Sequence, residues 1–430
     1  MYKETARNLL EFIGKSPSVF HVIDNLRTML LENGFAELSE KEQFLLEEGK
    51  DYFVTRNDSS LVAFRMPRKV KGKEALGFHL VATHSDSPTF KVKHNPEMIT
   101  EGKYVRINTE KYGGMILSTW LDRPLSVAGR LVLEEKGEVV RRLVNVDRDL
   151  FVIPNVAIHM NRDMNKGVEY NPQVDMIPLF AMKEEEDVQS GLIDIVAKSA
   201  GVESEDVLDY DLFLYVREQG RILGANEEFV LSPKLDDLQC VYAQADAFIK
   251  AQPNAYISVA AVFDNEEVGS GTMQGADSTF LSDVLQRICL SMGLTREEYM
   301  EKVASSMLIS ADNAHAVHPN HPEKADPTNR PYVNGGPVVK YHGSQKYTTD
   351  AVSGGYLKML CKKAKVPYQT YYNRSDIAGG STLGNISTAH VSVASVDIGL
   401  PQLAMHSAME TAGVRDTVYA IKIFEEFFAE

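Results

Sequence analysis

The sequence predicts an α/β protein with a mainly parallel sheet flanked by helices and an inserted β-rich domain. At 430 residues the chain is long for one hydrophobic core. Towards both ends, short apolar runs alternate with segments of helical periodicity, as in a parallel sheet covered on both faces. Residues 92–231 instead carry alternating runs between turn residues. We therefore expect residues 1–91 and 232–430 to form one domain, with residues 92–231 inserted into it.

The first part of the chain predicts two helices and then a buried strand. Apolar side chains recur at helical spacing over residues 5–13. A serine–proline pair at 16–17 supplies a cap and a first-turn proline for a second helix, and Gly34 is a suitable stop for it. Residues 77–83 are almost entirely apolar and predict a strand that stops at His84.

The inserted part predicts strands and turns. Residues 130–140 indicate a hairpin that turns near Lys136–Gly137, and residues 211–216 indicate a further strand. The acidic run at 183–187 is interpreted as a solvated loop.

Residues 232–430 return to alternating helices and apolar strands. A helix is expected from the Asp236–Asp237 doublet to Phe248, and strands are expected at 256–263, 307–310 and 390–397. Open α/β sheets bind their ligands beyond the carboxyl ends of the strands. Polar residues that directly follow these strands are therefore candidates for a functional site.

Composition excludes several classes of partner and cellular context. The formal net charge of −15 argues against nucleic acid and anionic membranes, which need a basic surface. No apolar run approaches the ~20 residues that span a bilayer, and the first residues lack the pattern of a signal peptide. We expect a soluble, cytoplasmic protein with reduced and buried thiols at its three cysteines, Cys240, Cys289 and Cys361.

Six acidic and imidazole side chains stand out as a potential metal site: His84, Asp236, Glu266, Glu267, Asp312 and His406. Each also has a simpler interpretation that is common in proteins. His84 could lie in a polar turn with the serine and aspartate that follow it, and an aspartate could cap a helix or turn. The two glutamates could be an exposed pair, and His406 could be a buried histidine with ordinary hydrogen-bond partners. Together, however, they supply one imidazole and one terminal carboxylate for each of two metal ions, a bridging carboxylate and a spare glutamate as proton acceptor. Asp86 lies two residues after His84 and is expected to hold the second ring nitrogen of that histidine.

Five sequence blocks resemble the aspartyl aminopeptidase family and occur in the same order across nearly the whole chain. They are residues 84–88, 235–238, 265–270, 310–320 and 405–407. The resemblance implies a zinc exopeptidase domain split by a dimerisation domain, and a tetrahedral dodecamer built from dimers that encloses the active sites. It also implies that the enzyme is a metalloaminopeptidase.

The resemblance further implies a role for individual residues. The metal ligands would be His84, Asp236, Glu267, Asp312 and His406, with Asp236 as the bridge. Glu266 would be the general base, and Asp86, as the partner of His84, is counted with it among the catalytic residues. His159 would reach the site of a neighbouring subunit, and the substrate would contact His315, Lys340 and Tyr347. Members that strictly prefer acidic N-terminal residues have asparagine where this chain has Asp237, so the preference for Asp or Glu is less firmly implied.

The expected reaction is removal of the N-terminal residue of a peptide by water that two divalent metal ions activate. Zinc is the expected metal, and cobalt or manganese also suits nitrogen and oxygen ligands without cysteine. The expected partners are peptides with a free N-terminus and further copies of this chain. Two alternatives remain at this point: a metal-dependent amidase or deacylase on the same scaffold, and a non-catalytic assembly protein.

Overall fold

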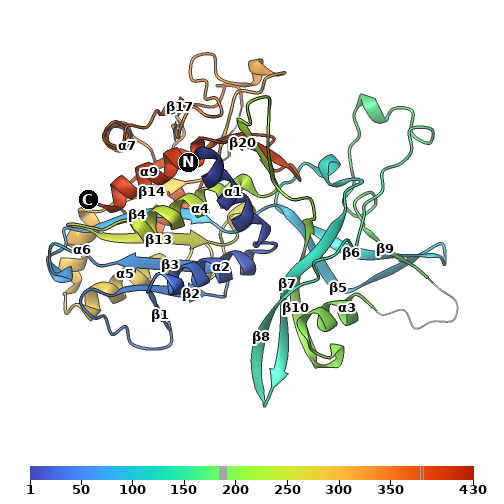
Figure 1. Ribbon diagram of the computed structural model, residues 1–430, viewed down its shortest axis with the longest axis horizontal. Coiled ribbons are helices and arrows are strands. Elements are labelled where there is room, and N and C mark those ends of the chain that lie inside the picture. Colours follow the sequence, from blue (N-terminus) through green and yellow to red (C-terminus); the bar gives the residue numbers. More distant parts are fainter. Residues whose placement is uncertain (184–190, 378, 381) are drawn as a thin grey trace.

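The computed structural model describes residues 1–183, 191–377, 379–380 and 382–430. A nine-stranded mixed sheet lies at its centre, and an antiparallel sheet extends to one side (Figure 1). In spatial order the central sheet consists of β1 (Ala36–Leu38), β2 (Asp51–Arg56), β3 (Ser60–Arg65), β13 (Ile257–Phe263), β4 (Phe78–His84), β14 (Met307–Ala311), β18 (Ala394–Gly399), β16 (Val338–Lys340) and β17 (Gln369–Tyr371).

Four adjacent strands in the middle of this sheet, β13, β4, β14 and β18, are mutually parallel. In their register Phe263 lies opposite His84, and Ser310 lies opposite Ala82. β4 and β13 are buried along their whole length, which explains their continuous apolar sequences. Because parallel strands end at the same edge, the residues that follow them meet there. The predicted α/β class with a mainly parallel sheet is confirmed.

Helices cover both faces of the central sheet, and side chains of β4 alternate between the two layers. Val81 packs with residues of α1, α2, α4, α7 and α9, whereas Leu80 and Ala82 pack with α5 and α8. The helices that form these layers are α1 (Tyr2–Gly14), α2 (Val19–Glu32), α4 (Leu235–Lys250), α5 (Phe280–Ser291), α6 (Arg296–Ala304), α7 (Ala351–Ala364), α8 (Leu383–His390) and α9 (Asp416–Phe428).

The second sheet is antiparallel and uses only residues between Thr89 and Val216. Its order is β8 (Glu138–Asn145), β7 (Leu125–Glu135), β10 (Val207–Val216), β5 (Thr89–Thr100), β6 (Tyr104–Tyr112) and β9 (Leu179–Met182). Helix α3 (Leu192–Ala200) packs into its hydrophobic core. The predicted β7–β8 hairpin is confirmed. The exact bounds of the inserted domain, 92–231, stay a prediction.

A third, five-stranded sheet connects segments that are distant in sequence. It consists of β11 (Arg221–Leu223), β12 (Phe229–Ser232), β20 (Glu410–Gly413), β19 (Pro401–Leu403) and β15 (Ala314–His315). β12 leads into α4, and the loop from β19 to β20 carries His406. This sheet therefore brings the Asp236 and His406 segments to the same region.

Some local predictions were wrong or incomplete. The second helix begins at Val19, with Ser18 rather than Ser16 at its cap position. The strand predicted at 390–397 begins only at Ala394, because His390 is the last residue of α8 and the apolar valines that follow do not pair. The acidic run at 183–187 lies, after its first residue, outside the described residues.

The predictions for the cysteines are confirmed, because all three are buried and form no disulfide. Among the described residues, no helix combines the length and apolar character that a membrane crossing requires.

Candidate metal centre

The carboxyl ends of three neighbouring parallel strands place four of the predicted site residues together. β4 ends at His84, and β14 is followed directly by Asp312. β13 leads into a 3-10 turn at Glu266–Val268, which lies between Asn265 and Gly269, both in the left-handed region. Ligand atoms of the two adjacent glutamates lie within 4.8 Å of one another and of His84. They are partly buried, which contradicts the alternative of an exposed charged pair.

Asp236 and His406 approach the same edge from the third sheet. Asp236 lies at the start of α4, but its backbone angles and those of Asp237 are not helical, and the peptide bond between them is cis. Among the described residues no backbone N–H of the first turn of α4 donates to either carboxylate, and Asp237 Oδ2 accepts from the His84 N–H instead. His406 lies in the loop between β19 and β20 with a φ of 65°, a conformation that few non-glycine residues adopt.

The side chains form two groups that share Asp236. In the first group, His84 Nε2 lies 3.6 Å from Asp236 Oδ1 and 3.9 Å from Asp312 Oδ1. In the second group, His406 Nε2 lies 3.5 Å from Asp236 Oδ2 and 3.3 Å from Glu267 Oε1. Each oxygen of the Asp236 carboxylate thus faces a different imidazole.

Both groups have the composition and geometry of metal-binding sites. Ligand atoms of His84, Asp236, Asp237 and Asp312 lie within 4.8 Å of one another, as do those of Asp236, Glu267 and His406. Asp236 Oδ1 and Glu267 Oε1 are buried and have no hydrogen-bond donor among the described residues. Buried carboxylate oxygens without a donor are costly, and a cation between them removes that cost. The residues therefore fit divalent metal ions.

The carboxylate of Asp86 organises the residues around His84. It accepts hydrogen bonds from the N–H groups of Glu266 (3.1 Å) and Glu267 (3.2 Å). His84 Nδ1 lies 3.1 Å from the Asp86 carbonyl oxygen and 3.4 Å from its Oδ1. These contacts direct Nε2 of His84 towards Asp236, as the sequence predicted for this aspartate.

Glu410 is a buried residue of the site that the sequence reasoning missed. Its carboxylate accepts hydrogen bonds from the N–H groups of His406 (2.6 Å) and Asp236 (3.0 Å). It therefore joins the two segments that form the second group. No motif identified it, because its only sequence signal is a glutamate four residues after His406.

Burial and contacts between charged side chains raise the pKa values of several groups in the site. Burial raises the pKa of Glu266 to about 8, that of Glu267 to about 7 and that of Glu410 to about 8. Burial opposes a charge on His406, but contacts with Asp236 and Glu267 raise its pKa to about 11. Asp237 is fully buried, and burial raises its pKa well above the usual value. Its Oδ2 accepts a hydrogen bond from the His84 N–H (3.3 Å).

The remaining predicted residues lie at different distances from the centre. Lys340 is buried, donates to the carbonyl oxygen of Asn313 (2.9 Å) and lies 3.6 Å from Asp312 Oδ2. The ring of Tyr347 lies 5.5 Å from its ammonium group. His315 is exposed at the end of β15. His159 is exposed in the long loop between β8 and β9, which projects away from the central sheet (Figure 1).

Residues 12–428 match the family described as aminopeptidase I zinc metalloprotease (M18). The chain belongs to the M18 family. A Clostridium acetobutylicum protein described as "Probable M18 family aminopeptidase 2" is 48% identical over 99% of this chain and 98% of its own length. This M18 chain is a zinc-dependent aminopeptidase, and of the three functions considered from the sequence the family match supports this one.

The chain is also similar to solved structures over nearly its whole length. The complex of Ape4 with Nbr1 contains a chain that superposes with a TM-score of 0.95 at 36% identity, covering 100% of this chain and 86% of that chain. The S. cerevesiae mApe1 dodecamer superposes with a TM-score of 0.85 at 27% identity, covering 99% and 97%.

Proposed function

We propose that two zinc ions occupy the two groups, with Asp236 as the bridging ligand. His84 and Asp312 would complete one site, and His406 and Glu267 the other. The observation that carries this proposal is the orientation of Asp236, whose two oxygens face the two imidazoles while Oδ1 has no donor. When bound, such ions polarise the scissile carbonyl and lower the pKa of water.

In this proposal Glu266 is the general base of peptide hydrolysis. It is adjacent to the proposed ligand Glu267, and burial raises its pKa to about 8, in the range that suits proton transfer at neutral pH. Glu266 would accept a proton from the attacking water and return it to the leaving amine. Asp86 would keep the glutamate turn and the His84 ring in place through the contacts described above.

The variant Glu266→Gln tests this assignment. We expect kcat to fall by at least ~100-fold with the zinc content preserved, since the amide cannot accept the proton. Full turnover with normal zinc would remove Glu266 from the mechanism. Loss of zinc together with activity would assign it to the metal ligands instead.

We also propose that the enzyme accepts peptides with an acidic first residue and that Lys340 contributes to this preference. Lys340 is a buried cation beside Asp312, and Tyr347 lies against it. Because Lys340 also lies beside Asp312, a proposed metal ligand, its removal could disturb the metal site as well as the recognition of the substrate. The test therefore compares substrates that differ only in their first residue. Lys340→Ala should reduce kcat/KM more for Asp- and Glu-initiated substrates than for Leu-initiated ones. An equal loss on all three would exclude Lys340 from specificity.

We finally propose a homododecamer built from dimers, in which residues 92–231 form the dimerisation domain and His159 completes a neighbouring active site. The dodecameric mApe1 and the exposed position of His159 support this proposal. Co-expression of a His159→Ala chain with a Glu266→Gln chain tests it. Each variant alone should be nearly inactive, whereas mixed assemblies should regain activity, because a subunit with an intact Glu266 receives His159 from its neighbour. Absence of recovery in verified mixed assemblies would contradict a role in trans.

A further inference from the structure

Three consecutive residues of the inserted sheet lie directly against the candidate metal centre. They are Tyr112, the last residue of β6, and the two glycines that follow it, Gly113 and Gly114. The Tyr112 hydroxyl donates to Asp86, the Gly114 carbonyl oxygen lies beside His406, and a Cβ atom added at Gly113 would meet Glu267. The segment belongs to the same chain as the site, so these contacts do not depend on assembly.

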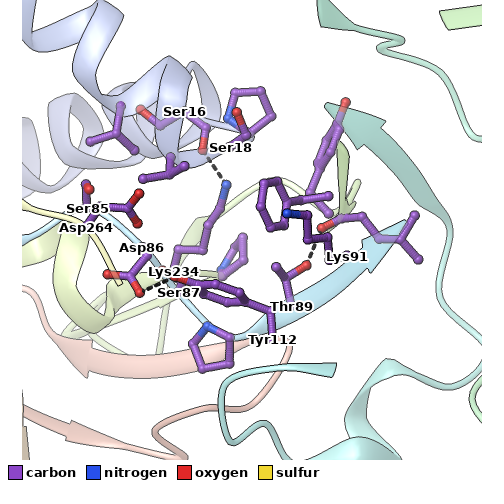
Figure 2. A pocket seen from close by; sticks show the side chains of 18 of the residues that line it. Ser16, Ser18, Ser85, Asp86, Ser87, Thr89, Lys91, Tyr112, Lys234 and Asp264 are labelled. Atoms are coloured by element: carbon purple, nitrogen blue, oxygen red, sulfur yellow. Dashed lines mark hydrogen bonds between the residues drawn. The ribbon is translucent and has the colours of Figure 1, made fainter. Parts of the chain in front are cut away.

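Tyr112 connects the inserted sheet to the group around His84. Its hydroxyl donates to Asp86 Oδ2 (2.7 Å) and accepts from Asn265 Nδ2 (2.8 Å). In Figure 2 the hydroxyl end of Tyr112 points to Asp86 at the border of a cavity of about 190 Å³. The ring packs edge-on against Phe213 of β10, with centroids 5.7 Å apart. The inserted sheet therefore fixes the ring, and the ring fixes the carboxylate that orients His84.

The two glycines connect the same segment to the other group. The Gly114 carbonyl oxygen lies 3.0 Å from His406 Nδ1, and the Ile116 N–H donates to the His406 carbonyl oxygen (2.9 Å). Gly113 has a φ of 78°, and a Cβ atom there would lie 3.2 Å from the Cβ atom of Glu267. The carbonyl contact selects the ring orientation that turns Nε2 of His406 towards Asp236.

We propose that the segment Tyr112–Gly114 is a positioning element of the metal centre in its own subunit, with Tyr112 as a positioning residue. The inserted domain thus has a second role besides assembly: one turn of it aligns both imidazoles and one terminal carboxylate. This inference rests on the two-metal site proposed above. Hydrogen-bonding partners of metal ligands typically contribute 10- to 100-fold to metal affinity or activity.

The first experiment compares Tyr112→Phe with Tyr210→Phe in the assembled enzyme. Tyr210 is a matched control because its hydroxyl donates to the Lys93 carbonyl oxygen (2.9 Å) within the inserted sheet and, among the described residues, to no residue of the metal centre. Zinc affinities are measured by competition with a chelator, and the cobalt-loaded proteins are compared by visible absorption. We expect Tyr112→Phe to weaken one of the two zinc sites by about 10- to 100-fold and to change the cobalt spectrum. Tyr210→Phe should match the unaltered protein.

The second experiment compares Gly113→Ala with Gly137→Ala. Both glycines have positive φ, but a Cβ at Gly137 would meet nothing within 4 Å. Backbone strain is thus similar at the two positions, whereas only a Cβ at Gly113 would meet Glu267 and, at 3.4 Å, Pro88. We expect only Gly113→Ala to weaken the site that Glu267 and His406 would form. Thermal unfolding of all four variants identifies general loss of structure.

The outcomes separate this inference from the proposed function. If the unaltered chain binds two zinc ions and both Tyr112→Phe and Gly113→Ala bind them equally well, the positioning role is wrong and the two-metal site stands. If the unaltered chain binds no zinc, the two-metal site and the positioning role both fail.

Discussion

Glu410 offers a sharp test of how the second proposed zinc site is built. The substitution Glu410→Gln preserves the size of the side chain but replaces one carboxylate oxygen with an NH₂ group. The amide oxygen of the glutamine can then accept a hydrogen bond from the backbone N–H of either His406 or Asp236. The other of these two N–H groups faces the NH₂ group, which is itself a donor. The two segments are no longer held by one side chain.

The expected magnitude follows from this loss of one acceptor. A buried donor without an acceptor costs about 1–3 kcal/mol. We expect this cost to destabilise the conformation in which His406 and Glu267 would bind zinc. Since 1.4 kcal/mol corresponds to a factor of ten, the zinc affinity of that site should decrease by roughly 5- to 150-fold. The zinc site formed with His84 should change less, because Glu410 accepts from the N–H of Asp236 but contacts neither His84 nor Asp312 among the interactions found.

Asp416 provides the matched control for this substitution. It is also fully buried, and its carboxylate accepts from the N–H groups of Asn334 (2.6 Å) and Gly336 (2.9 Å). Asp416→Asn should therefore lower the free energy of unfolding by a similar amount without changing zinc affinity. Zinc competition and urea unfolding of both variants measure the two quantities. Equal zinc affinity in Glu410→Gln and the unaltered chain would refute the argument.

Three further predictions follow from the structure. Zinc binding to the metal-free protein should release protons at pH 7, because the His406 ring, with a pKa raised to about 11, is protonated before the metal binds. Calorimetry in buffers of different ionisation enthalpy measures this release. Binding heats that do not depend on the buffer would contradict the prediction. Because the pKa of His406 is higher in the folded, metal-free protein than in the unfolded chain, its protonated ring adds to the free energy of unfolding. This contribution is complete below the unfolded pKa of about 6.5 and is lost as the pH rises through the folded pKa of about 11. Unfolding experiments at several pH values measure the change. Gly129→Ala should lower the free energy of unfolding by about 1–3 kcal/mol, because its Cβ atom would lie 1.9 Å from the Asp211 carbonyl oxygen. Urea unfolding measures this loss, and an unchanged unfolding curve would contradict the prediction.

The class of the fold and the chemistry of the candidate site could both be predicted from the amino-acid sequence. Apolar runs such as residues 77–83 predicted buried parallel strands because a strand covered on both faces needs no polar side chains. Polar residues at the ends of such strands predicted a site because parallel strands end at one edge. The order of five family blocks then implied which side chains would hold metal, and the structure brings all of the predicted ligands together.

The residues that surround and orient those side chains could be identified only in the folded protein. Glu410 and Tyr112 carry no motif, since a backbone N–H 174 residues away or a carboxylate 26 residues away leaves no local pattern in a sequence. The His406 ring is likewise held by the Gly114 carbonyl oxygen, which is 292 residues away in the sequence. The local sequence shows which side chains can bind metal. It does not show how those side chains are oriented, because the hydrogen bonds that orient them connect separate elements of the fold.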